Sequence, residues 1–592
     1  MEAKARSFNF IGTEGLITIP FFQRSYVWNQ DNWEELLADL LNNEKSHFLG
    51  SLILKQQKTS TGDPKQALVI DGQQRLTTLS ILVKALYDSF SDKLKLACID
   101  SIRRHLFYKV NETDENYFIK IRHSHLDSEA FGTVISNGIE SVYIDYSEKT
   151  STSRIISCYS YFTKEFKKYD ETDRTRLFNS LLNTDNKILV VIDLEDSDNE
   201  QSIFDTINSS GVRLSAADII KNSLFQRYIN LSDKEAAIKL YNKTWDDSFL
   251  KDEESIQYWG KQRTTGRLLR DNIEILLHAI AVIKGFYDPE KHTLSDLSDL
   301  YKSKIESFLT KEDLSNFIAE ISEYASIYRS KILSFDEKTT FTYFDYEQRL
   351  FHILEVFEIS TLHPYILSIY KNHSNDPEEI KQILGTLECF IIKRLIAKEE
   401  IKSFNKLCKD FINDTSLVKQ KISEISFSNF VSGIKSINNK PATLLLFWVE
   451  LFRRHNDNKF ALKELKYDYT LEHIMPQKWE EFWTTFPPLK DDNGNLLSQE
   501  NLTKNRLEKI YSIGNMTLLT GSLNTSLRNY EFQRKMRGEG RKNGIIVYAD
   551  LSITSVDIVE PFLKGDTNWD ETKIEARTTT LLNEIINIWN VV

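Results

Sequence analysis

The stretch from residue 232 to residue 465 constrains the fold of this chain more than any other feature. Apolar residues recur there at the spacing of amphipathic helices, and proline and glycine are scarce. On one side, residues 15–230 mix strand-like and helical patterns, and on the other, glycine, asparagine and proline return from residue 466. We find no repeat of fixed period. The pattern predicts a mostly helical, multidomain α+β protein with domains at 1–230, 231–465 and 466–592.

Length and composition narrow the class of protein. A chain of 592 residues is too long for one hydrophobic core, which agrees with several domains. No apolar run approaches the roughly 18–20 residues that cross a bilayer, and the N-terminus has no apolar signal-peptide core. The four cysteines form no CxxC pair, which argues against a zinc ribbon and indicates free thiols. We therefore expect a cytoplasmic protein that does not contact a membrane.

The net charge of −11 argues against a protein that binds nucleic acid over its whole surface. Any DNA contact must therefore come from a local concentration of basic residues. Such a strip lies between residues 528 and 542, where two glutamates oppose six basic residues: Arg528, Arg534, Lys535, Arg537, Arg541 and Lys542. We predict that Arg528, Arg534 and Lys535 contact the phosphate backbone of double-stranded DNA. The alternative is an ordinary solvated helix face.

A strand-to-helix turn in the N-terminal region carries the pattern of an anion site. A short apolar strand at 67–70 ends at Asp71–Gly72, and a helical pattern begins near Gln73. Free N–H groups at a helix start favour anions, and Arg75 adds a bidentate phosphate donor. We predict a nucleotide site in which Gln73 and Gln74 orient a phosphate or a water, and Asp71 holds a metal ion or polarises water. No GxxxxGK[ST] sequence occurs, which excludes a P-loop.

Two further segments are expected to reach the same cleft. IPFFQRSYVW (19–28) supplies Gln23 and Arg24, and FDTINSSGVRLSAADIIKN (204–222) supplies Asn208 and Asp218 for contacts to ribose or base. The second segment also starts a helix, with Ser215 as its N-cap and Asp218 as the acid at the third position. Each of these residues also has a structural alternative. In that alternative Asp71–Gly72 is an ordinary turn, Asp218 is only a capping residue, and Arg24 is a buried ion-pair partner.

The C-terminal region carries an acid–histidine pair in YDYTLEHIMPQKW (467–479), followed by IGNMTLLTGSLNTSLRNYEFQRK (513–535). Together these segments resemble the HNH endonuclease pattern. The resemblance implies a ββα-metal fold in which His473 is the general base, and Glu472 and Asn524 hold one Mg²⁺ or Mn²⁺ ion. It implies that Asn515 holds the base strand and its loop in register. The alternative is that His473 is a structural histidine and that Asn515 is an ordinary turn residue.

The pieces EHIMPQ, GNMTLL, LN and a Phe followed by a basic residue are, in this order, similar to the C-terminal domain of GmrSD-type restriction enzymes. The N-terminal segments, with VIDGQQRLTTL (69–79) among them, resemble the DGQQR domain of the same enzymes, which is similar to the ParB and sulfiredoxin fold. The resemblance implies a modification-dependent (type IV) restriction endonuclease. Its expected cofactors are the metal ion and a nucleoside triphosphate: GTP, UTP, CTP or ATP.

The resemblance also implies modified double-stranded DNA as the target, with either glycosylated hydroxymethylcytosine or a phosphorothioate link as the signal. It leaves a homodimer or a partner defence protein open. We therefore predict an antiphage nuclease whose activity is gated by nucleotide binding or hydrolysis in the N-terminal domain. Two other classes remain: a nucleotide-switched DNA-binding sensor without robust nuclease activity, and a hydrolase that uses the DGQQR site alone.

Overall fold

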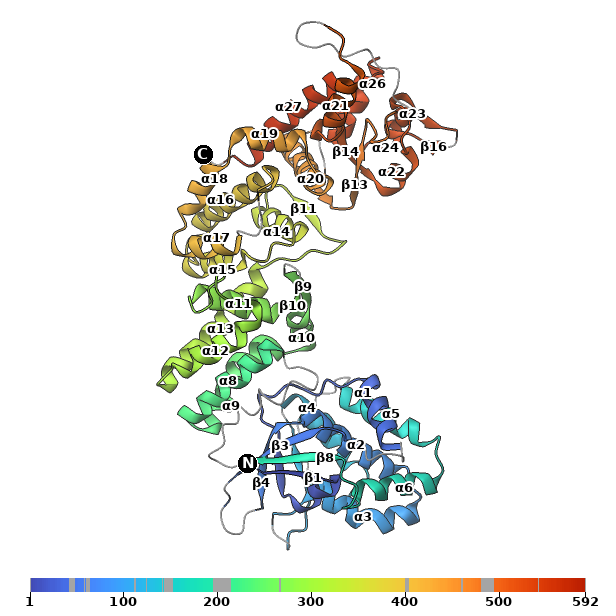
Figure 1. The fold of residues 1–592 in the computed structure, drawn as a ribbon, viewed down its shortest axis with the longest axis vertical. Coiled ribbons are helices and arrows are strands. Elements are labelled where there is room, and N and C mark those ends of the chain that lie inside the picture. Colours follow the sequence, from blue (N-terminus) through green and yellow to red (C-terminus); the bar gives the residue numbers. More distant parts are fainter. Residues whose placement is uncertain are drawn as a thin grey trace. The chain divides into compact units, whose positions relative to one another are not determined.

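The computed structural model describes residues 2–41, 48–57, 59, 64–110, 113–123, 125–140, 142, 153–194, 215–265, 268–399, 404–458, 462–480, 495–540 and 542–590. The chain forms two compact units, Met1–Tyr241 and Asn242–Val592 (Figure 1). Unit 1 combines a mixed sheet with helices, and unit 2 is almost entirely helical. The protein is thus mostly helical and α+β, as the sequence predicts. The domain boundaries at residues 230 and 465 stay predictions.

Unit 1 is built on a six-stranded sheet of order β1-β8-β3-β4-β2-β7. The strands β3 and β4 are antiparallel, whereas β3 pairs with β8 and β4 pairs with β2 in parallel. The edge strand β1 runs antiparallel to β8, and the other edge strand, β7, runs parallel to β2. The strands are β1 (Glu2–Arg6), β2 (Leu16–Thr18), β3 (Ser51–Gln57), β4 (Gln66–Asp71), β7 (Ile121–Arg122) and β8 (Leu189–Leu194).

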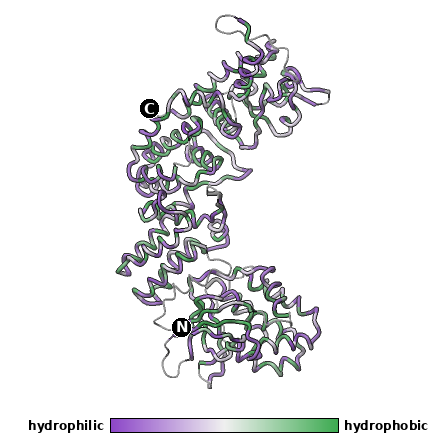
Figure 2. The backbone as a smooth tube through the Cα atoms, viewed as in Figure 1, coloured by the Kyte–Doolittle hydropathy of each residue, from purple (hydrophilic) through white to green (hydrophobic). Residues whose placement is uncertain are grey.

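The helix α2 (Gln73–Asp88) is the centre of unit 1, because nearly all of its side chains are buried. It packs against α3 (Asp92–Leu106), α4 (His125–Ser136), α5 (Arg154–Phe166) and α6 (Glu171–Leu182). Alternate strand residues such as Leu52 and Val69 join the main core, whereas Ile53 and Ile70 form a second apolar cluster. Both faces of the central strands are therefore buried, and Figure 2 shows the sheet as a concentration of hydrophobic residues.

The strands β2, β3, β4 and β8 account for the strand-like patterns within residues 15–230, and the apolar strand predicted at 67–70 lies in β4. The helix α1 spans Gln30–Leu41. The helix predicted to begin after Ser215 is α8 (Ala216–Leu231), where the Ser215 side chain accepts a hydrogen bond from the Asp218 N–H. The edge strands β1 and β7 were not expected, because a polar edge strand and a two-residue strand carry no apolar period.

The first part of unit 2 is helical, as predicted, apart from two short pairs of strands. The pair β9 (Gln262–Thr265) and β10 (Leu268–Asp271) is a hairpin, and β11 (Thr340–Thr342) pairs with β12 (Glu464–Lys466). Along the helices, hydrophilic and hydrophobic residues alternate (Figure 2). The helices are η3 (Asn242–Leu250), α10 (Glu253–Gly260), α11 (Asn272–Ile283), α12 (Leu297–Glu306), α13 (Lys311–Lys331), α14 (Tyr346–Val356), α15 (His363–Asn372), α16 (Pro377–Ile396), α17 (Phe404–Asn413), α18 (Leu417–Glu424), α19 (Phe427–Lys435) and α20 (Asn439–Asn456).

The last part of unit 2 surrounds an antiparallel pair, β13 (Tyr469–His473) and β14 (Met516–Thr520). The helix α20 packs on both strands and on α27, so residues 439–456 belong to the same packed core. The other elements are α21 (Gln499–Ile510), η6 (Ile513–Asn515), α22 (Gly521–Leu527), α23 (Phe532–Arg537), β15 (Gly538–Glu539), β16 (Lys542–Asn543), α24 (Ile545–Tyr548), α25 (Ser552–Thr554), η7 (Ser555–Val559), α26 (Glu560–Leu563) and α27 (Glu571–Ile588). Among the described residues, no helix is both long and apolar enough to span a membrane.

Candidate active site

The C-terminal candidate residues meet at the strand pair β13–β14 and the helix α22 that follows it. Glu472 and His473 end β13, opposite Thr517 and Met516 of β14. Asn524, on α22, donates its amide N–H groups to the Thr470 hydroxyl at 3.0 Å and to the Leu471 carbonyl at 2.8 Å. These two bonds fix α22 to β13 and use the donor end of Asn524, so its amide oxygen is the end that can accept or ligate. Asn524 is thus bound to the strand that ends in Glu472 and His473.

Asn515 is fully buried and ties the loop after β13 to the start of β14. Its side chain accepts from the Met475 N–H at 2.8 Å and from the Trp569 indole at 3.1 Å, and it donates to the carbonyls of Met475 and Ile510 at 2.8 and 3.1 Å. The backbone of Asn515 also accepts from the Ile474 N–H at 2.9 Å. The two residues after His473 are therefore fixed through residue 515, and a turn asparagine would make fewer such bonds.

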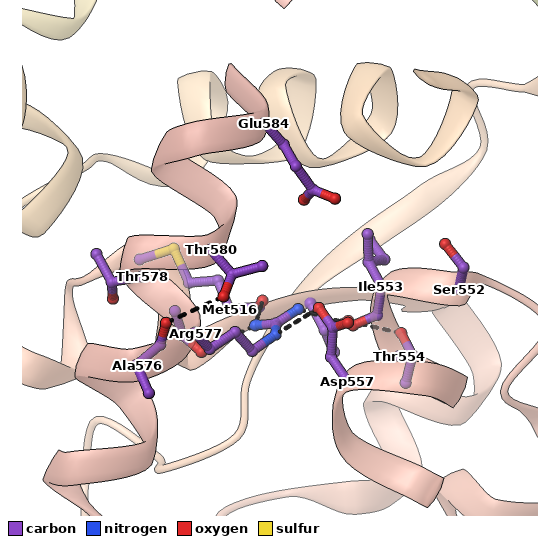
Figure 3. Close-up of polar contacts among 12 residues, drawn as sticks. Met516, Ser552, Ile553, Thr554, Asp557, Ala576, Arg577, Thr578, Thr580 and Glu584 are labelled. Carbon is purple, nitrogen blue, oxygen red and sulfur yellow. Dashed lines mark hydrogen bonds and ion pairs between the residues drawn. The ribbon is translucent and has the colours of Figure 1, made fainter. Parts of the chain in front are cut away.

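A buried arginine on α27, Arg577, contacts the main chain next to Asn515 and is drawn in Figure 3 with its partners Met516 and Asp557. The Arg577 guanidinium donates to the carbonyls of Gly514 at 2.8 Å and Met516 at 2.6 Å, and to the Asp557 carboxylate at 3.0 Å. It therefore fixes the main chain on both sides of Asn515. Sequence reasoning missed Arg577, because a single arginine on an amphipathic helix gives no signal of what it contacts about 60 residues away.

The His473 imidazole is half-buried, and its Nε2 atom has no hydrogen-bond partner within the described residues. Its ring lies edge-to-face with Tyr511, with 6.1 Å between the ring centroids. Burial, and then the positive charge of Lys535, lower the pKa of the imidazole to about 4. The neutral form, which accepts a proton, is therefore the one present near pH 7.

Glu472 is buried beside a lysine that we expected elsewhere. The Lys535 ammonium lies 2.5 Å from the Oε1 oxygen of Glu472 and donates to the carbonyl of His473 at 2.7 Å. Burial raises the pKa of the Glu472 carboxyl, although the charge of Lys535 opposes this shift. The prediction that Lys535 is part of an exposed strip fails on this point, because its side chain is fully buried. A surface phosphate does not reach a group in this position.

The rest of the basic strip lies at the surface. Arg528 is exposed, and Arg534 is half-exposed, stacks on Tyr530 at 3.5 Å and pairs with Glu539. Lys542 is exposed, and Arg541 lies outside the described residues. The sequence pattern placed Lys535 in this strip because it lies within a run of basic residues, but the helical turn of α23 directs it inward.

The donor set fits a divalent ion. The carboxylate of Glu472, which Lys535 contacts at Oε1, and the amide oxygen of Asn524 are hard ligands of the kind that Mg²⁺ prefers. The buried Nε2 of His473 is a polar atom that a bound group would satisfy. Across the described residues, no cluster of three or more His, Cys, Asp or Glu side chains forms a complete cage. An ion here would keep several waters, which suits Mg²⁺.

In unit 1, the turn from β4 into α2 is shaped by Gly72. Its φ is +91°, and a Cβ atom there would lie 2.8 Å from the Leu52 side chain and 2.9 Å from the Ser51 carbonyl. Only glycine combines this left-handed backbone with such close approach to β3. The start of α2 therefore abuts β3 directly, with Arg75 donating to the Ser51 carbonyl at 3.4 Å.

The three glutamines of the predicted nucleotide site contact the main chain of the protein. Gln74 accepts from the Val27 N–H at 2.8 Å and donates to Ser25, and Gln73 donates to the Arg24 carbonyl at 3.0 Å. Gln23 donates to the Val69 carbonyl at 2.7 Å. Gln73 and Gln74 are also buried. All three join the loop at residues 20–28 to the segment at residues 69–75, so part of their hydrogen-bonding capacity is already used.

The charged residues near this turn influence one another electrostatically. Burial raises the pKa of the Asp71 carboxyl, while the Gly72 N–H, Arg75 and Arg24 oppose the shift. Burial also acts to raise the pKa of the Asp218 carboxyl. Neighbouring groups, Lys221 above all, outweigh burial, so the pKa of Asp218 is lowered. The structure brings Arg24, Asp71, Arg75 and Asp218 together as expected. Asn208 lies outside the described residues.

The Asp218 carboxylate has two roles in this geometry. It accepts from Lys221 at 3.0 Å and from the Ser215 hydroxyl at 3.0 Å, as a capping residue does. It also acts electrostatically on Arg24. Sequence reasoning did not single out Lys221, which is buried one helical turn after Asp218. Its position on the same face was the available signal.

A two-stranded pair with a following helix and a histidine at the strand end, in a chain that also has an α/β unit, defines a candidate nuclease. Two family models match this chain. GmrSD restriction endonuclease, N-terminal domain, matches residues 6–225, and GmrSD restriction endonucleases, C-terminal domain, matches residues 423–584. The chain belongs to the GmrSD-type restriction endonucleases, a class that acts on DNA. A comparison with curated proteins finds no match.

Proposed function

We propose that this protein is a metal-dependent HNH endonuclease that restricts modified foreign DNA, such as phage DNA, under the control of a nucleotide. The observation that carries the proposal is the strand-end pair Glu472–His473 held beside Asn524 and Asn515. In this proposal residues 469–527 form the ββα-metal element, and unit 1 has a ParB/sulfiredoxin-like fold.

The chemistry of the C-terminal site follows from three side chains. His473 takes the proton from the attacking water, for which its neutral Nε2 is suited. Glu472 and Asn524 would hold a single Mg²⁺ or Mn²⁺ ion, which supplies charge neutralisation at the phosphate and the leaving oxygen. Asn515 keeps the strand and the loop in register, so that the imidazole is presented at a fixed place. Arg528 and Arg534 lie at the surface, where they contact the phosphate backbone.

The N-terminal site binds a nucleoside triphosphate at the start of α2 and hydrolyses it. Arg75 and Arg24 contact its phosphates, and Asp71 and Asp218 contact a metal ion or the ribose. Gln23, Gln73 and Gln74 keep the loop and the turn together. Nucleotide occupancy shifts the loop–turn junction between two states and thereby gates the nuclease. The target is DNA carrying either glycosylated hydroxymethylcytosine or phosphorothioate links.

One experiment tests both sites. Full-length protein is incubated with unmodified DNA and with each modified DNA, in Mg²⁺, with and without each of the four triphosphates. His473→Ala should lower nicking by about 10²- to 10⁴-fold. Arg75→Ala should weaken triphosphate binding by roughly 10- to 100-fold, since a charge-assisted hydrogen bond is lost, and should keep basal nicking.

Four outcomes contradict the proposal. Nicking by His473→Ala at the unmutated rate would refute the HNH assignment, as would undiminished cleavage in excess chelator. Unchanged triphosphate binding by Arg75→Ala would refute the nucleotide site. If the unmutated protein binds modified DNA in a nucleotide-dependent way and cuts none of the substrates, the chain is the DNA-binding sensor that the sequence left open.

A further inference from the structure

The most unusual group in the C-terminal site is the Lys535 ammonium, which is fully buried and paired with a carboxylate. Burying a charge is costly unless it is paired and hydrogen-bonded, so a protein keeps such a group only where its partners hold it. Lys535 has two partners of different kinds: the carboxylate of Glu472 at 2.5 Å and the backbone carbonyl of His473 at 2.7 Å. These are consecutive residues at the end of β13.

We propose that Lys535 is a positioning residue of the nuclease site, which fixes the carboxylate of Glu472 and the main chain of His473 with one ammonium group. This inference rests on the proposed HNH function and assigns to Lys535 a role different from contact with DNA. Lys535 contacts Oε1 and thereby fixes the orientation of the carboxylate, which would ligate an ion together with the amide oxygen of Asn524. Its bond to the carbonyl of His473 limits rotation of the peptide that carries the imidazole.

Lys535 is itself held firmly. It lies on α23, whose Phe532 stacks on Trp569, and Trp569 donates to the side chain of Asn515. The main chain is tightly packed here as well, since a Cβ atom at Gly544 would lie 2.6 Å from the Lys535 carbonyl. The ammonium is therefore connected through packed groups to the same asparagine that holds the loop after His473.

A substitution at Lys535 separates positioning from DNA contact. Lys535→Met should lower kcat about 10- to 100-fold and weaken Mn²⁺ binding by a similar factor, the usual effect of losing an outer partner of a metal ligand. The KM for DNA and the salt dependence of DNA binding should stay at the unmutated values. The matched control is Lys564→Met, an exposed lysine outside the basic strip. It should leave kcat, the affinity for Mn²⁺ and the salt dependence of DNA binding unchanged.

Mn²⁺ binding, measured by electron paramagnetic resonance without DNA, does not depend on activity. If the unmutated protein nicks no DNA, the proposed function fails, but the comparison of Mn²⁺ affinity between Lys535→Met and the unmutated protein still tests the inference. The proposal is overturned if Lys535→Met changes KM and the salt slope while kcat is intact. It is equally overturned if kcat and Mn²⁺ affinity are both unaffected.

Removing one partner of a buried pair can prevent folding. The double variant Lys535→Met, Glu472→Gln removes both charges, so it should fold, as checked by circular dichroism. Its DNA affinity and salt slope should equal those of the single variant Glu472→Gln. A smaller salt slope in the double variant would show that Lys535 contacts phosphate, and would refute positioning.

Discussion

Replacement of Arg577 by methionine should destabilise the C-terminal part of unit 2 strongly. The guanidinium donates to three buried backbone carbonyls, at Gly514, Met516 and Ile553, over 2.8, 2.6 and 2.7 Å. Methionine donates to none of them, and each buried carbonyl left without a partner costs roughly 1–3 kcal/mol. The Asp557 carboxylate keeps its two bonds from Arg453, at 2.8 and 3.1 Å, so it is not left unpaired.

The magnitude follows from these terms. Three unsatisfied carbonyls would cost up to about 9 kcal/mol, but some will rotate toward water, and the cost of burying the guanidinium disappears in the variant. We therefore expect a loss of about 3–5 kcal/mol in the free energy of unfolding, the range found when one partner of a buried ionic network is removed. Part of this loss should come from the main chain around Asn515, because the carbonyls of Gly514 and Met516 no longer have Arg577 as a partner.

Urea unfolding followed by circular dichroism gives the global loss, and hydrogen exchange followed by mass spectrometry gives its location. Peptides from β14 and α27 should lose protection in Arg577→Met, whereas peptides from α2 in unit 1 should not change. Lys564→Met is the control, because its side chain is 77% exposed and its ion pair with Glu560 is worth little. A loss below about 1 kcal/mol, or equal deprotection of α2, would refute the reasoning.

Three further variants test other contacts. Asn515→Asp keeps the shape of the side chain but removes both N–H donors toward Met475 and Ile510. It should lower the free energy of unfolding by about 3 kcal/mol or more and abolish nicking, as measured by thermal melts and a nicking assay. Gly72→Ala should lower the free energy of unfolding by at least about 2 kcal/mol and weaken triphosphate binding, because φ at residue 72 is +91° and the added methyl group would clash with the Ser51 carbonyl. Calorimetry of unfolding and of triphosphate binding measures both effects. Asp127→Asn should stabilise unit 1 above pH 6. Burial raises the pKa of Asp127 to about 6, although the Tyr26 N–H opposes the shift, so the native protein loses stability between pH 4 and 6 as the carboxyl ionises. The advantage of the Asp127→Asn variant, up to about 3 kcal/mol at pH 8, should vanish at pH 4 in paired melts.

Much of unit 1 was predictable because its strands and its capped helix are local patterns. The apolar run before Asp71 and the Ser215–Asp218 cap each fall within a few residues and need no distant partner. The roles of Gln73 and Gln74 were not predictable in the same way. Their partners are backbone groups 46 to 49 residues earlier, and a main-chain partner leaves no mark in the side-chain sequence.

In the C-terminal site, too, contacts between residues far apart in the sequence could not be predicted. The pair Glu472–His473 and the later Asn515 and Asn524 could be placed because the resemblance supplied their order. Lys535 was placed wrongly because the basic residues around it favour solvent, whereas its own burial depends on Glu472, 63 residues earlier. The number of basic residues in a segment indicates that the segment is exposed on average, but it does not show whether one particular side chain, such as that of Lys535, is buried.

Both motifs divide their residues between holding the backbone and leaving groups available to a ligand. At residues 71–75, Gln73 and Gln74 are used by the loop at 24–28, and the charged pair Asp71 and Arg75 has the remaining capacity. At the end of β13, Oε1 of Glu472 and the carbonyl of His473 are used by Lys535, and Nε2 of His473 has no partner among the described residues. A residue of a motif whose hydrogen bonds are already filled can affect a ligand only through the groups that it holds in place, whereas a residue with an unfilled atom can contact the ligand itself. Gln74 therefore acts through the loop that it holds, whereas His473 can act on a ligand directly, although both residues lie within the segments that define the family.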